Sequence, residues 1–79
     1  MTNLEKYNQI FVEVFGVSAN VLNDNFSKAS VADWDSVHQL NIISLMEDAF
    51  DIMIDPDDIM SCTSYEAGKD ILMKNGIDL

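Results

Sequence analysis

The segment from Trp34 to Phe50 carries the strongest helical pattern in the chain. At about 100° per residue, six of its apolar side chains fall on one wide arc, namely Ile42, Ile43, Leu45, Met46, Ala49 and Phe50. Asp35 precedes this arc, and aspartate is a favoured N-cap because its carboxylate accepts a hydrogen bond from a free amide of the first turn. The pattern therefore predicts a helix that begins at Ser36 and turns this arc toward the core.

The first residue of this predicted helix is a serine whose hydroxyl we expect to be exposed. Ser36 would lie at the positive end of the helix dipole, where free amides favour a phosphate group. Val37 and Leu40 fall on the polar side of the same helix, close to this hydroxyl. Two interpretations of these side chains stay open: they form a docking patch for a partner, or a neighbouring loop covers them.

A second helical pattern occupies the N-terminal part of the chain. We expect a cap at Thr2 or Asn3, and Gly16 is placed to end the helix in a left-handed turn. Its core stripe comprises Leu4, Tyr7, Phe11, Val14 and Phe15. Residues 17–34 are rich in turn formers and predict a long loop. The apolar side chains expected to pin this loop are Val21, Leu22, Phe26, Val31 and Trp34.

Two helices are predicted after residue 54. Asp55-Pro56 is a typical start for a short helix through Met60, because proline fits the first helical position. Thr63 and Glu66 have the spacing of a capping box, which predicts a last helix that runs to about Asn75. Its inner stripe comprises Tyr65, Gly68, Ile71 and Leu72. We expect residues 77–79 to be frayed. The predicted fold is an all-α domain over residues 1–79, a small four-helix bundle of three longer helices and one short helix, with a long loop between the first two.

Composition limits the classes of partner. The chain of 79 residues has one cysteine, so no internal disulfide can form, and Cys62 is expected to be a small buried side chain in a reducing compartment. Fourteen acids against four lysines give a net charge of −10, which argues against nucleic acid and anionic membranes and favours basic protein partners. Nothing at the N-terminus resembles a signal peptide, and no apolar run could span a bilayer, so we expect a cytoplasmic protein.

The sequence offers no convincing catalytic or metal site. Ser36 and His38 are two residues apart, so on a helix they point in different directions and cannot form a nucleophile–base pair. His38 is expected to be an exposed polar residue near Ser36. The acids that follow Ile54 invite a calcium interpretation, but a loop starting at Asp55 would place Met60 where an EF-hand needs glycine. We therefore expect neither an enzyme nor a metal-binding protein.

The sequence resembles the acyl carrier and peptidyl carrier protein family. Asp35-Ser36-Val37, followed by a helix that ends in Leu-Met-Glu-Asp-Ala-Phe, is similar to the family's Asp-Ser-Leu motif. The similarity extends to Phe15-Gly16-Val17 at the end of the first helix, to Asp55–Ile59 in the short helix and to Thr63–Ala67 at the start of the last. This resemblance implies a single carrier-protein domain, 1–79, in which Ser36 carries a 4′-phosphopantetheine arm.

The resemblance also implies partners and a docking surface. A phosphopantetheinyl transferase would place the arm, using coenzyme A and magnesium. An acyl- or aminoacyl-loading ligase would then charge the arm as a thioester, and downstream transferases with basic docking surfaces would use it. The chain itself would be a monomer and not an enzyme. The implied docking residues are Asp35, Val37, Leu40, Asn41, Ser44, Glu47 and Asp48, extended by Asp57 and Asp58.

Several positions differ from the pattern of fatty-acid carriers. Val37 stands where leucine is usual, and Ala32-Asp33-Trp34-Asp35 lacks the usual Leu-Gly element. These differences favour a carrier of a specialised biosynthetic pathway that handles modified acids, amino acids or surface-glycan substituents. Two alternatives stay open. In the first alternative, the chain would be a small acidic helical interaction module without a covalent arm. In the second, it would be a degenerate carrier that docks with enzymes but is never loaded.

Overall fold

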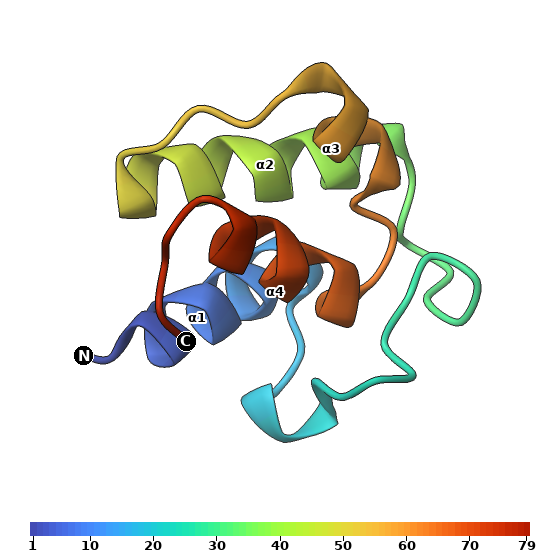
Figure 1. Ribbon diagram of the computed structural model, residues 1–79. Coiled ribbons are helices and arrows are strands. Elements are labelled where there is room, and N and C mark those ends of the chain that lie inside the picture. Colours follow the sequence, from blue (N-terminus) through green and yellow to red (C-terminus); the bar gives the residue numbers. More distant parts are fainter.

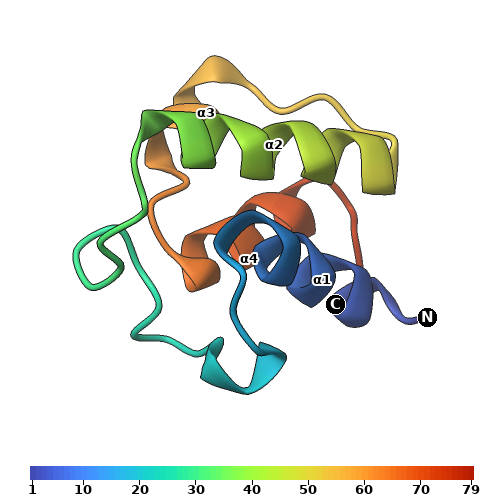
Figure 2. The same cartoon turned by 180° about the vertical axis from the view of Figure 1, so that it is seen from behind.

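The computed structural model describes residues 1–79 and confirms the all-α fold. Its elements are α1 (Asn3–Phe15), the short 3₁₀ helix η1 (Ala19–Val21), α2 (Ser36–Phe50), α3 (Pro56–Ser61) and α4 (Tyr65–Lys74). Figure 1 shows α2 and α3 on one side of the molecule and α1 and α4 on the other, and the reverse view in Figure 2 shows the same arrangement. The two chain ends lie close together, below one end of α2.

Helix α1 begins and ends as its sequence predicts. Thr2 is the N-cap, and its hydroxyl accepts a hydrogen bond from the Glu5 amide while the Glu5 carboxylate accepts one from the Thr2 amide. Gly16 ends the helix at a φ of 65°, a left-handed conformation that favours glycine. Of the predicted stripe, Tyr7 and Phe11 are buried, whereas Leu4 remains exposed near the chain end.

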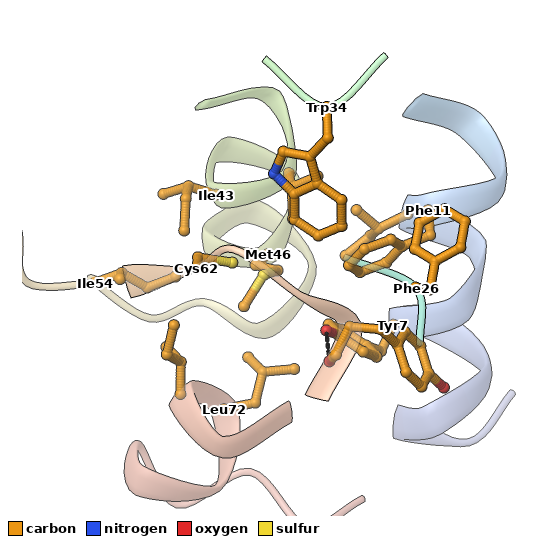
Figure 3. Close-up of a cluster of buried hydrophobic side chains, with 13 residues drawn as sticks. Tyr7, Phe11, Phe26, Trp34, Ile43, Met46, Ile54, Cys62 and Leu72 are labelled. Atoms are coloured by element: carbon orange, nitrogen blue, oxygen red, sulfur yellow. Dashed lines mark hydrogen bonds between the residues drawn. The ribbon is translucent and has the colours of Figure 1, made fainter. Parts of the chain in front are cut away.

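An aromatic cluster fills the space between α1, α4 and the long loop. Phe11 lies at its centre, with ring centroids between 5.0 and 5.9 Å from those of Tyr7, Phe26, Trp34 and Tyr65. Figure 3 shows Trp34 and Phe26 pointing toward Phe11, with Met46 and Cys62 on the other side of the core. Burial of Cys62 confirms that this residue packs as a small apolar side chain.

Close packing of α1 on α4 depends on Gly68. The Tyr7 hydroxyl reaches between the helices and donates a hydrogen bond of 2.6 Å to the Tyr65 carbonyl oxygen. A Cβ atom at position 68 would overlap this hydroxyl. The absence of a side chain at Gly68 therefore gives the tyrosine hydroxyl the space it occupies.

The loop over residues 17–34 is tied to the start of α4. The Lys28 amide donates to the Thr63 carbonyl, and the Tyr65 amide donates to the Phe26 carbonyl, each at 2.8 Å. Phe26 and Trp34 are buried as expected, but Val21 is 44% exposed and does not pin the loop. These two backbone bonds bring the lysine of the loop next to the junction between α3 and α4.

Three local predictions are wrong besides the burial of Leu4 and of Val21, which are both exposed. Ala49 is exposed, because it lies at the edge of the arc that α2 buries. The cap of α4 is Ser64, whose hydroxyl accepts from the Ala67 amide, so the helix starts one residue later than a Thr63 cap requires. Residues 77–79 are not frayed, because the Ile77 amide donates to the Leu72 carbonyl and two apolar side chains pack on the core, Ile77 and Leu79.

Candidate functional site

The first turn of α2 is held by Asp35. Its Oδ1 atom accepts a hydrogen bond from the His38 backbone amide at 2.9 Å and lies 2.8 Å from His38 Nδ1. The hydrogen bond from the His38 amide, and then the contact with the imidazole, lower the pKa of the Asp35 carboxyl below its ordinary value. The N-cap predicted from the sequence is therefore present, and it sets where the helix begins.

Ser36 occupies the first position of α2 and is exposed. Its hydroxyl makes no hydrogen bond within the chain, so the oxygen is free to react with a group from outside. The imidazole of His38 packs parallel to the Phe15 ring, with centroids 5.5 Å apart and planes 11° apart. Because the ring is also bonded to Asp35, His38 is half-buried, contrary to the exposed position predicted for it, and it does not activate Ser36.

A groove of about 280 Å³ lies beside Ser36. It runs between α2 and α3, and its lining residues are Lys28, Ser36, Gln39, Leu40, Ile59 and Met60. Leu40 and Met60 are 54% and 78% exposed, so the apolar part of the groove is open to solvent. No pattern in the sequence predicts that Lys28 and α3 lie beside Ser36. They come together only in the folded chain.

Gln39 is a site residue that the sequence reasoning missed. Its Nε2 atom donates to the Ile59 carbonyl at 2.7 Å and lies 3.5 Å from the Met60 carbonyl, which ties α3 to α2. Its Oε1 atom is buried and has no hydrogen-bond partner. A signal was present in the spacing, because Gln39 precedes Ile42 by three residues and Ile43 by four and so falls on the buried arc.

The predicted docking residues lie in different surroundings. Of the seven that belong to α2 and its cap, six are exposed, namely Asp35, Val37, Leu40, Asn41, Ser44 and Asp48. Val37 is 65% exposed, so no loop covers the first turn of α2. Leu40 faces the α2–α3 groove. Asn41 and Ser44 instead border a depression shared with Glu13 of α1.

Three other acids of the predicted docking surface belong to different surroundings. Glu47 is half-buried, and its Oε2 atom accepts a 3.0 Å hydrogen bond from the Ile54 amide, which holds the connection after α2. Asp58 pairs with Lys74 Nζ at 3.0 Å, and this hydrogen bond raises the pKa of the lysine. Asp57 is exposed at the start of α3. Glu47 and Asp58 thus have structural partners within the chain.

The geometry defines an all-α bundle with an exposed serine hydroxyl at the start of α2 and an open groove next to it. No three side chains of the histidine, cysteine, aspartate or glutamate type are grouped in a way that could hold a metal ion. None of the helices combines the length and the apolar character needed to cross a membrane. No protein-family model matches the chain, and no curated protein is significantly similar to it.

Proposed function

We propose that this protein is a carrier protein that holds acyl or aminoacyl groups as thioesters on a 4′-phosphopantetheine arm attached to Ser36. The observation that carries the proposal is the Ser36 hydroxyl, exposed and without an intramolecular partner at the N-terminus of α2. A phosphate attached there would meet the free amides and the positive end of the helix dipole. When attached, the arm supplies a thiol that forms the thioester.

The attachment reaction requires little from the chain beyond a presented oxygen. The Ser36 oxygen would bond to the phosphorus that carries pantetheine in coenzyme A, the pyrophosphate bond would break, and adenosine 3′,5′-bisphosphate would leave. Neither Asp35 nor His38 makes a hydrogen bond to the hydroxyl. The serine proton would therefore pass to a base of the transferase, and Asp35 would act by holding the helix start in place.

The surface around Ser36 suits a basic partner. Val37, Leu40 and Met60 are exposed apolar side chains on α2 and α3. Between Ala29 and Gly68 the chain has nine acids and no lysine or arginine. Lys28 is the one cation that borders this surface. Apolar contacts surrounded mainly by negative charge favour an enzyme with a complementary positive surface. Dependence on coenzyme A agrees with the cytoplasmic location expected from the sequence.

Loading of Ser36 is the direct test. The protein is incubated with coenzyme A, magnesium and a phosphopantetheinyl transferase of broad specificity, and its intact mass is measured. We expect a gain of one phosphopantetheinyl group, which Ser36→Ala abolishes. Ser44→Ala is the matched control, because Ser44 is an exposed serine on the same helix. No mass gain, or a gain that survives Ser36→Ala, would refute the proposal.

The same surface also supports a second candidate function. Exposed Val37 and Leu40 among acids would suit a small interaction module that binds a basic partner without any arm. The two functions differ in one observable. A carrier isolated from its own host bears the arm on Ser36, whereas an interaction module shows the mass of its unmodified sequence.

A further inference from the structure

Four of the five methionine side chains lie on the surface. They are Met1, Met53, Met60 and Met73, with Met53 at 87% and Met60 at 78% exposure, whereas Met46 is fully buried in the core. This distribution is unusual, because methionine is among the residue types that are most often buried. Packing of the core therefore explains only Met46.

Met60 is the one exposed methionine that lines the α2–α3 groove beside Ser36. Figures 1 and 2 show α3 lying against the N-terminal end of α2. Gln39 Nε2 holds the backbone of α3 there, because it donates to the Ile59 carbonyl at 2.7 Å and lies 3.5 Å from the Met60 carbonyl oxygen. A fixed backbone and an exposed side chain keep the thioether at the open side of the groove, which Leu40 also lines.

The one thiol of the chain is withdrawn from oxidants. Cys62 is fully buried, and burial raises the pKa of its thiol to about 11, so little reactive thiolate exists at neutral pH. A thioether has no ionisable proton, so its reaction with a peroxide does not depend on a pKa. The exposed methionines are therefore the sulfur atoms that a peroxide in solution reaches first.

We propose that Met60 is a site of reversible oxidation that controls docking at the α2–α3 groove, an inference that rests on the carrier function proposed above. A lone pair of the thioether sulfur attacks one oxygen of hydrogen peroxide, the S–O bond forms, the O–O bond breaks, and the second oxygen leaves as water. The sulfur loses two electrons and the peroxide gains them. The sulfoxide is polar, so part of the apolar wall beside Leu40 becomes a hydrogen-bond acceptor. A partner enzyme that buries this wall then covers an unpaired polar group, which weakens docking.

Peptide mapping after peroxide treatment tests the site itself. Apo protein, which has no arm thiol, is treated with a graded series of hydrogen peroxide concentrations at pH 6 and at pH 8. We expect Met60 to become sulfoxide together with Met53 and well before Met46, at similar rates at both pH values. A methionine sulfoxide reductase should restore the original mass. Conversion of Met46 as early as Met60 would overturn the proposal.

Loading kinetics test the control of docking. The peroxide is removed, and the transfer of phosphopantetheine from coenzyme A to Ser36 is then measured with one transferase on oxidised and on untreated apo protein. We expect the KM for oxidised protein to be about tenfold higher, which corresponds to about 1.4 kcal/mol. The kcat should be nearly unchanged, because a docking contact contributes equally to the bound substrate and to the transition state.

Variants identify the methionine that is responsible. Met60→Leu removes the sulfur and should abolish the rise in KM on peroxide treatment. Met53→Leu is the matched control, because Met53 is equally exposed but does not line the groove, and this variant should keep the rise. Met60→Gln introduces a polar side chain of similar length and should raise KM without peroxide. Each leucine variant is compared with itself before and after treatment, so its own starting KM does not affect the result.

The outcomes distinguish this inference from the function on which it rests. If oxidised protein with Met60 fully converted loads as well as untreated protein, control by oxidation is overturned and the carrier function stands. The same conclusion follows if Met60→Leu and Met53→Leu show the same rise in KM. If untreated protein does not load on Ser36, both proposals are overturned.

Discussion

Substitution of Gly68 by alanine tests how α1 and α4 pack. The added Cβ would overlap the Tyr7 hydroxyl, which is bonded to the Tyr65 carbonyl at 2.6 Å. Overpacking costs about 1–3 kcal/mol, and loss of a buried hydrogen bond costs about 1–3 kcal/mol more. Alanine recovers about 1 kcal/mol of helix propensity. The expected net loss in unfolding free energy is therefore about 3 kcal/mol.

The assay is a double-mutant cycle with Tyr7→Phe, followed by thermal and urea unfolding. A loss of that size lowers the melting temperature of a domain of this length by about 12–24 °C. Tyr7→Phe removes the overlapping oxygen, and the nearest remaining ring atom lies 3.1 Å from the added Cβ. In the Tyr7→Phe background, Gly68→Ala should cost less than about 1 kcal/mol, because only a small ring shift is needed.

Two results would refute this reasoning. One is a neutral or stabilising Gly68→Ala in the wild-type background, which would mean that the helices separate at no cost. The other is additivity, in which the alanine costs the same with tyrosine or phenylalanine at position 7. Coupling between the two sites is expected because the two groups would occupy the same space.

Three further predictions concern the caps and the cysteine. The pKa of the Asp35 carboxyl is lower in the folded protein than its unfolded value of about 3.8. The carboxylate therefore stabilises the fold above that unfolded value, and the stabilisation is lost as the pH falls through the folded pKa. Asp35→Asn should accordingly make the unfolding free energy depend less on pH in this acid range. Ser64→Ala should cost about 1 kcal/mol in urea unfolding, whereas Thr63→Ala should be nearly neutral; equal losses would contradict the cap assignment. Burial raises the pKa of the Cys62 thiol to about 11, so a thiol reagent at neutral pH should react slowly with native protein and quickly in denaturant.

Local signals along the chain were sufficient to predict the helices. The start of α2 at Asp35-Ser36, the end of α1 at Gly16 and the proline start of α3 all depend on hydrogen bonds and dihedral angles within a few residues. The cap of α4 was misplaced by one residue because Thr63 and Ser64 are both good caps. Choosing between them depends on the bridge between residues 27 and 64, which joins distant parts of the chain.

Contacts between helices that are distant in the sequence could not be predicted from it. Nothing in the sequence distinguishes Glu47 and Asp58 from acids that have no partner within the chain. In the structure, the Glu47 carboxylate accepts a hydrogen bond from the Ile54 amide, and Asp58 pairs with Lys74. Periodicity states which face a residue occupies, but it does not state which element lies opposite. A carboxylate that holds the fold together therefore looks, in the sequence, like one that is available to a partner.

The sequence by itself determined that Ser36 begins a helix with its hydroxyl exposed, because capping and side-chain direction are set by neighbouring residues. Only the tertiary structure decided what lies beside that hydroxyl. Lys28 is eight positions away in the chain and Met60 is twenty-four, and they meet Ser36 because the loop and α3 fold against α2. The groove exists because packing brings distant segments together, and no local pattern specifies that arrangement.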